Sequence, residues 1–375
     1  MKRLQVVLAF LLYSFILSGQ TKDAVINPVP PEVKIAGTQL QHLHSVITGR
    51  DYDLQINLPR FYSDTSRTFP VLFLLDSQWD FPLVQGIYGE QYYDGFLPEM
   101  LIVGITWGGN NPNYDSLRAA DFVPYNNPEI LQSGNAPNFL KFIKEELIPF
   151  VEKNYRVKKD DRALMGSSFG GLFTLYTMFT EADLFDKYIM TSPAIGWDES
   201  HIYKTEKEFS QNNKSLPAKV YMTIGDYEDF NGLQNFIDSI KSRNYNGLQL
   251  ETSILKNMGH SGTKSVGYTR GLQFAYKRPA FDPDQAVLDK YAGFYANQSG
   301  MKVEIKTGDK KLLAVMPNGE KINFSAINNS DFQMTGSYLF IHFITDKTGN
   351  VAGFNLSQFG GDTFMEKLNE KSGLK

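Results

Sequence analysis

Gly166-Ser167-Ser168-Phe169-Gly170 is the stretch of sequence that decides the fold. It lies between a short, mostly apolar stretch (Arg162–Met165) and an apolar, helix-like run (Gly171–Phe179). A serine hydroxyl is a poor nucleophile at neutral pH, so an enzyme holds it on a sharp strand-to-helix turn beside a base and backbone N–H donors. Glycines on both sides let the backbone make this turn without Cβ clashes. The pattern predicts a nucleophile elbow with Ser168 at its tip, although G-x-S-x-G alone also fits an ordinary glycine-rich turn.

Two strand-like runs lie downstream, and each leads into a candidate catalytic side chain. Ala218–Ile224 precedes Gly225-Asp226-Tyr227-Glu228-Asp229, and Leu248–Leu255 precedes Lys256-Asn257-Met258-Gly259-His260. Serine, acid, histidine is the chain order of an α/β-hydrolase triad. Because parallel strands end at the same edge of a sheet, three loops at that edge can bring these side chains together.

Composition excludes several classes of protein. The chain has 375 residues, enough for one large domain or two ordinary ones, and a formal net charge of -4. Since it contains no block of lysine and arginine, we expect no nucleic-acid partner. The absence of cysteine excludes disulfides, thiolate zinc sites and a cysteine nucleophile. No metal or cofactor is expected, because neither H-E-x-x-H nor a run of His and carboxylate ligands is present.

The amino terminus has the pattern of a secretory signal. Met1-Lys2-Arg3 precedes about a dozen mostly apolar residues (Val6–Leu17) and then Ser18-Gly19-Gln20. A membrane anchor is the alternative, but the run is shorter than the ~20 residues that span a bilayer. We therefore expect a signal peptide over 1–20, a linker over 21–39, and an exported protein, periplasmic or extracellular, with no membrane span in the mature chain.

The rest of the chain shows two different sequence patterns, one after the other. Strand-like runs at Tyr52–Leu58, Pro70–Leu75 and Met100–Thr106, with a helical pattern over Asn138–Phe150 that Pro149 should kink or end, predict an α/β fold with a mostly parallel sheet over residues 40–281. From residue 282 to 375 short alternating runs predict an all-β domain, a small sandwich or barrel. These runs are Lys302–Lys306, Lys311–Val315, Ile322–Phe324, Leu339–Ile344 and Gly353–Leu356.

Residues from about 40 to about 278 resemble the putative esterase family of α/β-hydrolases, which includes siderophore esterases and carbohydrate esterases such as feruloyl esterases. The matching segments are Pro70–Trp79, Val103–Pro124 with Arg118 and Asp121-Phe122-Val123-Pro124, the elbow, Ser192-Pro193 with Trp197, Gly225-x-x-Glu228 and Gly259-His260. The resemblance implies helices on both faces of the sheet and ester hydrolysis through an acyl-serine. Asp76-Ser77 replaces the family's usual Asp-Gly, which bears on the oxyanion geometry. Tyr291–Tyr295 looks like the start of the small β-domain appended to secreted serine hydrolases.

The candidate catalytic residues are Ser168 as nucleophile, His260 as general base and Glu228 as the acid that orients the imidazole. The family's acid falls three residues after the glycine, which favours Glu228, with Asp226 as the main alternative and Asp229 as a further one. The oxyanion hole is expected from the backbone N–H groups of Phe169 and of Gln78, in the loop after Leu75.

Trp107, Arg118 and Trp197 follow predicted strand ends and are the candidate substrate contacts, with Trp79 as a weaker one. Aromatic rings can stack on a catechol, a feruloyl group or a sugar face, or can simply cover the core. Arg118 can meet an anionic substrate or pair with Asp121.

The sequence predicts a secreted serine esterase acting on a siderophore lactone or another bulky acyl ester. A carbohydrate esterase that removes feruloyl or acetyl groups, an acyltransferase and a non-catalytic binding module remain open alternatives. The partner is a small-molecule or oligosaccharide ester; the sequence sets neither its acyl group and alcohol nor the oligomeric state.

Overall fold

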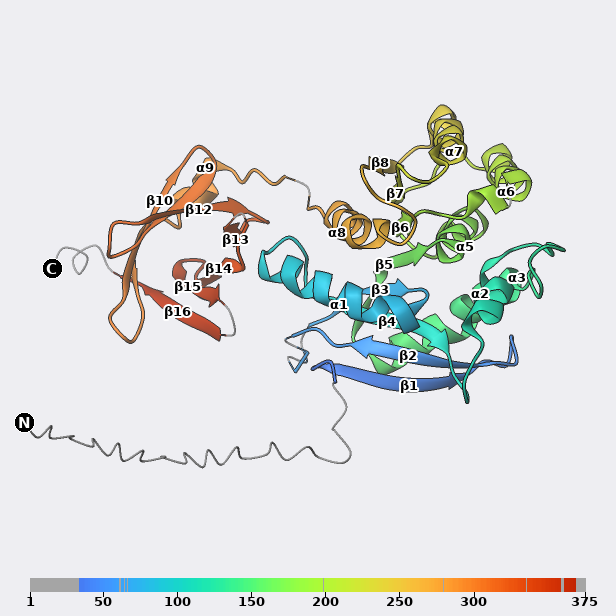
Figure 1. Ribbon diagram of the computed structural model, residues 1–375. Coiled ribbons are helices and arrows are strands. Elements are labelled where there is room, and N and C mark those ends of the chain that lie inside the picture. The colour runs from blue at the N-terminus through green and yellow to red at the C-terminus, as the bar shows by residue number, and fades with distance from the viewer. Residues whose placement is uncertain are drawn as a thin grey trace, which may run out of the picture. The chain divides into compact units, whose positions relative to one another are not determined.

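An eight-stranded mixed sheet dominates the computed structural model, which describes residues 34–368 except 61, 64, 66, 198, 279, 335, 359 and 360 (Figure 1). Its strand order is β1-β2-β4-β3-β5-β6-β7-β8. The pairs β1–β2 and β2–β4 are antiparallel and the other neighbours are parallel. The strands are β1 (Thr38–His44), β2 (Asp51–Asn57), β3 (Phe69–Leu74), β4 (Leu101–Trp107), β5 (Val157–Ser167), β6 (Lys187–Thr191), β7 (Lys219–Gly225) and β8 (Gln249–Leu255).

Helices cover both faces of this sheet, which confirms the expected fold class. Strands β3, β4 and β6 are buried along their whole length, as continuous apolar runs require. On one face, α1 packs against α8, and on the other, α5 packs against α2 and α6. The helices are α1 (Ser77–Tyr93), α2 (Tyr114–Phe122), α3 (Ala136–Phe142), α4 (Ile148–Asn154), α5 (Phe169–Thr180), α6 (Glu199–Asn212), α7 (Phe230–Arg243) and α8 (Thr263–Ala275), with short turns η1 (Ile143–Leu147) and η2 (Ile195–Trp197).

The helix expected over Asn138–Phe150 starts earlier and continues further. Asn135, not Asn138, is the residue before its first turn, and α3 passes through the π-helical turn η1 into α4 without a break in the chain. Pro149 lies in the first turn of α4. The wider π turn changes the hydrogen-bond register just before the proline, whose nitrogen cannot donate, so the helix is not ended there.

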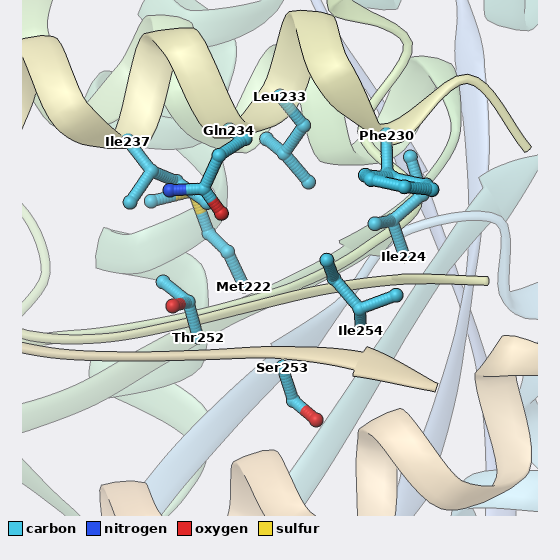
Figure 2. Close-up of a pocket in the computed structure, with 9 residues that line it drawn as sticks. All are labelled: Met222, Ile224, Phe230, Leu233, Gln234, Ile237, Thr252, Ser253 and Ile254. Carbon is cyan, nitrogen blue, oxygen red and sulfur yellow. The ribbon is translucent and has the colours of Figure 1, made fainter. Parts of the chain in front are cut away.

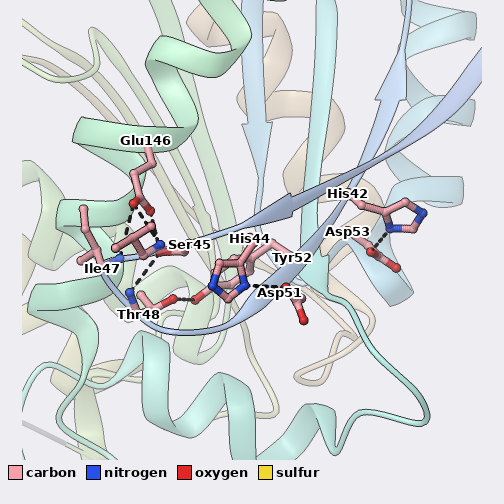
Figure 3. A network of polar contacts seen from close by, with 10 residues as sticks. His42, His44, Ser45, Ile47, Thr48, Asp51, Tyr52, Asp53 and Glu146 are labelled. Atoms are coloured by element: carbon pink, nitrogen blue, oxygen red, sulfur yellow. Dashed lines mark hydrogen bonds and ion pairs between the residues drawn. The ribbon is translucent and has the colours of Figure 1, made fainter.

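The π turn also holds the β1–β2 hairpin (Figure 3). Oε2 of Glu146, in η1, accepts the hydroxyl of Ser45 at 2.5 Å, and its Oε1 accepts the N–H of Val46 at 3.1 Å. Along the same hairpin, His42 pairs with Asp53 and His44 with Asp51 across the two strands. β1 begins at Thr38, inside the stretch expected to be a linker.

The carboxy-terminal part is a closed antiparallel barrel of eight strands in the order β10-β11-β12-β13-β14-β15-β16-β9, preceded by the short helix α9 (Gln285–Asp289). Leu288, Tyr295, Phe332, Phe343 and Phe354 are among its buried core residues. The sequence foresaw five of the strands and missed β9, β13 and β16. The strands are β9 (Gly293–Ala296), β10 (Lys302–Gly308), β11 (Lys311–Val315), β12 (Lys321–Ala326), β13 (Asp331–Met334), β14 (Leu339–Thr345), β15 (Val351–Gln358) and β16 (Gly361–Lys367).

The expected signal peptide, residues 1–20, lies outside the described residues. Within the described part of the chain, no helix combines the length and apolar character needed to cross a membrane.

Candidate active site

Ser168 occupies the turn between β5 and α5. Its φ is 59°, a conformation that residues with a side chain rarely adopt. Its N–H donates to the carbonyl of Thr191 at 3.1 Å, and its own carbonyl accepts the N–H of Ala194 at 3.0 Å. A Cβ at Gly166 would lie 2.5 Å from the carbonyl carbon of Gly170. The elbow therefore closes so tightly that a side chain at position 166 would clash with the first turn of α5.

Glu228 and His260 meet at the same edge of the sheet. Nδ1 of His260 lies 2.6 Å from Oε2 of Glu228. The other carboxylate oxygen of Glu228 accepts the N–H of Gly225 at 2.9 Å and the hydroxyl of Ser192 at 2.7 Å. The carboxylate is thus held in one orientation, with one oxygen left for the imidazole.

The rival acid, Asp226, bonds the backbone of the neighbouring histidine loop and not the ring of His260. Its Oδ1 accepts the backbone N–H of Met258 at 3.2 Å, in the segment that leads to His260. This contact supports the histidine loop through the backbone and makes no bond to the imidazole ring.

Ser168 and His260 follow β5 and β8, whose carboxyl ends lie at the same sheet edge. In the described part of the chain no hydrogen bond joins the two side chains, and nearly half of the His260 side chain is buried (51% exposed). Catalytic hydrogen bonds often tighten only when substrate is bound. The structure brings the acid and the base together after β7 and β8, and it places the serine after β5 at the same edge, two strands from β7 and three from β8.

The expected oxyanion donors belong to two helix amino termini. Phe169 is the first residue of α5 and Gln78 the second of α1, so neither N–H has an acceptor within its own helix. Asp76, before α1, has φ 52°, and its carbonyl accepts the N–H groups of Trp79 and Asp80, each at 3.1 Å. Ser77 therefore starts a helix directly, without the glycine common in the family.

Arg118 pairs with Asp76, and its expected alternative pairing with Asp121 is wrong. Nε of Arg118 donates to Oδ1 of Asp76 at 2.9 Å and Nη2 donates to Oδ2 at 2.7 Å. Burial lowers the pKa of Arg118, but the hydrogen bonds to Asp76 and its charge outweigh this and keep the pKa above its ordinary value. Asp121, fully buried, instead pairs with Arg50.

The three tryptophans have different surroundings. Trp107 is only 3% exposed, and its Nε1 donates to Asp121 at 2.8 Å. It is a core residue, and its burial leaves no ring face for a substrate. Trp197 and Trp79 are 54% and 48% exposed. The Trp197 ring lies edge-on to Phe169 with 6.3 Å between centroids, next to the elbow.

Two hydroxyls that sequence reasoning gave no role support the acid and histidine loops. Oγ of Ser192 lies 2.9 Å from Oγ1 of Thr263, which donates to the carbonyl of His260 at 2.8 Å. Both residues are buried. The Ser192-Pro193 pair was the available sequence signal, but nothing in the sequence predicts a contact with Thr263, 71 positions away.

A separate apolar pocket of about 230 Å³ lies under α7 at the β8 edge of the sheet (Figure 2). Leu233 and Ile237 of α7 face Met222 of β7 and Ile254 of β8 across it. None of the candidate catalytic residues lines it. Among the described residues, no group of three or more His, Asp or Glu side chains is arranged to hold a metal ion.

Comparison with known proteins identifies relatives of the sheet-containing part. The model of the family described as "Putative esterase" matches residues 45–252. The ferri-bacillibactin esterase BesA of Bacillus subtilis is 27% identical over 283 residues, which is 69% of this chain and 96% of BesA. The crystal structure of the BES protein from Bacillus cereus aligns with a TM-score of 0.59 at 24% identity and covers 67% of this chain and 98% of that one.

An IroE-like serine hydrolase from Shewanella oneidensis has the same fold, with a TM-score of 0.58 at 24% identity and coverage of 68% of this chain and 85% of that one. The family match spans more than half of the chain and includes both the elbow and the loop with Glu228. The chain belongs to the esterase family.

Proposed function

We propose that the chain is a secreted serine esterase that hydrolyses carboxylic esters through an acyl-serine intermediate. The observation that carries this proposal is the 2.6 Å contact between His260 and Glu228 at the sheet edge where Ser168 occupies a φ 59° turn. The roles are Ser168 as nucleophile, His260 as base and Glu228 as the acid.

In acylation, Oγ of Ser168 attacks the ester carbonyl and Nε2 of His260 takes the hydroxyl proton. Glu228 accepts Nδ1–H, which selects the tautomer with Nε2 free and stabilises the imidazolium that forms. The N–H groups of Phe169 and Gln78 stabilise the oxyanion. The tetrahedral intermediate then expels the alcohol, which receives the proton from His260.

In deacylation, a water molecule loses a proton to Nε2 of His260 as its oxygen attacks the acyl carbonyl. The second tetrahedral intermediate breaks the bond to Ser168, and the proton returns from His260 to Oγ. The products are a carboxylic acid and the free enzyme.

The proposed substrate is a siderophore lactone or another ester with a bulky acyl group. BesA is by name a ferri-bacillibactin esterase, and a relative from Aspergillus fumigatus, 29% identical over 172 residues, is by name a siderophore triacetylfusarinine C esterase, which supports this class. The half-exposed rings of Trp79 and Trp197 offer apolar surface on which such an acyl group can stack. Export is part of the proposal and rests on the amino-terminal sequence pattern.

The test is product analysis by mass spectrometry after incubation with a catecholate siderophore lactone, a feruloylated arabinoxylan fragment and an acetylated xylan fragment. Wild-type protein should release acid from the lactone, and Ser168→Ala should not. Release from a polysaccharide fragment alone would make the protein a carbohydrate esterase, and transfer of the acyl group to added alcohol in preference to water would make it an acyltransferase. Equal turnover by Ser168→Ala would overturn the proposed mechanism.

A further inference from the structure

Arg118 touches both segments that are expected to build the oxyanion hole. Besides its two bonds to Asp76, its guanidinium carbon lies 5.6 Å from the ring centroid of Trp79 and 5.3 Å from that of Phe169. Asp76 and Trp79 flank Ser77-Gln78 in the chain, and Phe169 is itself an expected donor. One side chain therefore joins the start of α1 to the start of α5.

The ion pair between Arg118 and Asp76 is largely buried. The Arg118 side chain is 14% exposed and the Asp76 side chain 1%. A Cβ at Gly170 would lie only 3.3 Å from Oδ2 of Asp76, so α5 approaches this carboxylate closely. A bidentate arginine–carboxylate pair fixes the relative orientation of its partners more strictly than a single bond does.

An oxyanion donor is effective when it lies about 2.7–3.1 Å from the position that the oxyanion will occupy. Removing one donor from such a hole typically lowers kcat by about 10²–10³-fold. A small displacement of the Gln78 segment relative to Phe169 should therefore also lower kcat, even though both donors are still present.

We propose that Arg118 is a positioning residue that holds the two oxyanion donors in register through Asp76, Trp79 and Phe169, rather than a residue that binds the acyl group. The inference rests on the proposed esterase function and goes beyond it. Two of the three guanidinium nitrogens are already committed to Asp76, which also balances the positive charge that an anionic substrate would need.

The experiment compares Arg118→Met, Asp76→Asn and the double variant with wild type. Kinetics are measured on p-nitrophenyl acetate and p-nitrophenyl hemisuccinate, which share a leaving group and differ in acyl charge. The rate of inactivation by a neutral fluorophosphonate is a second reading of the same hole, because charge also develops on its phosphoryl oxygen. Arg162→Met is the matched control: Arg162 is 16% exposed and bonds Glu152 at 2.6 Å.

Each single variant should lower kcat about 10- to 100-fold on both esters, with KM changed less than about threefold, and should slow inactivation by a similar factor. The kcat of the double variant should be no lower than that of the less active single variant, because both single changes remove the same interaction. Arg162→Met should lower the melting temperature and leave kcat unchanged.

A rise in KM for the hemisuccinate alone, with kcat on acetate intact and Asp76→Asn near wild type, would overturn the inference and make Arg118 a substrate contact. Losses in Arg118→Met that match a loss of folded protein, seen by circular dichroism, would also overturn it. Failure of the proposed function looks different: wild-type protein would then neither turn over an ester nor react with the fluorophosphonate.

Discussion

Nδ1 of His260 lies 2.6 Å from Oε2 of Glu228, and this pair distinguishes between the acids of the 225–229 loop. Glu228 contacts the imidazole ring, whereas Asp226 bonds the backbone of Met258. An acid that supports a base must reach its ring nitrogen, and only Glu228 of this loop does so among the contacts of the described residues.

Replacing Glu228 by Gln should therefore lower kcat by about 10³–10⁴-fold, because an amide can favour the wrong imidazole tautomer. Asp226→Asn is the matched control and should stay within about threefold of wild type, since an amide oxygen can still accept the N–H of Met258. Steady-state kinetics on one chromogenic ester decide the matter. A larger loss in Asp226→Asn than in Glu228→Gln would assign the acid to Asp226.

The elbow should tolerate no side chain at position 166. A Cβ there would lie 2.5 Å from the Gly170 carbonyl carbon and oxygen, so Gly166→Ala should displace Ser168 and remove most activity. Gly196→Ala is the control, because a Cβ at that position would meet no atom within 4 Å. Activity and melting temperature are measured for both. Full activity in Gly166→Ala would show that the turn is not as tight as the structure has it.

The two kinds of tryptophan should respond differently to mutation. Trp197→Ala should raise KM for esters of aromatic acids roughly 2- to 12-fold, the equivalent of about 0.5–1.5 kcal/mol for a lost ring contact, and leave KM for acetyl esters of the same alcohol unaffected. Trp107→Phe should keep KM and destabilise the fold by about 1–3 kcal/mol, because Asp121 loses a buried donor. Denaturant unfolding and KM values test both. An unchanged KM for every ester of an aromatic acid in Trp197→Ala would remove Trp197 from the substrate site.

A buried acid near the site predicts a pH-dependent stability. Burial raises the pKa of Asp80, although Lys264 at 2.7 Å and the hydroxyl of Tyr268 oppose the rise. The pKa of Asp80 is higher in the folded state than the unfolded value of about 3.9. The stability that this difference contributes is therefore fully present below about pH 3.9 and is lost as pH rises through the folded pKa. The stability of wild type relative to Asp80→Asn should thus fall between about pH 4 and the folded pKa.

Urea unfolding of both proteins at a series of pH values from 3.5 to 7 measures this difference. A wild-type advantage that grows with pH would contradict the raised pKa and would mean that the pair with Lys264 outweighs burial.

The sequence predicts the central sheet well because β3 and β4 are buried on both faces and read as unbroken apolar runs. It misses β1, where exposed and half-buried residues follow one another without the regular alternation of an amphipathic strand. The π turn was also out of reach, because π turns are rare and no local pattern in the sequence marks one.

Local sequence patterns are enough to locate three parts of the candidate site, which are the elbow, the acid loop and the histidine loop. Contacts between distant segments are not encoded in such patterns. Arg118 meets Asp76 across 42 positions, and the indole N–H of Trp107 meets Asp121 across 14. A tryptophan at a strand end reads the same in the sequence whether its ring is buried or exposed.

The central claim is that Ser168 becomes acylated, and intact-mass spectrometry after treatment with a fluorophosphonate tests it most directly. Wild-type protein should gain the mass of one phosphonyl group, and the modified peptide should contain Ser168. Ser168→Ala should gain none, while Ser167→Ala should still be labelled. An unmodified wild-type protein, or equal labelling of Ser168→Ala, would contradict the account.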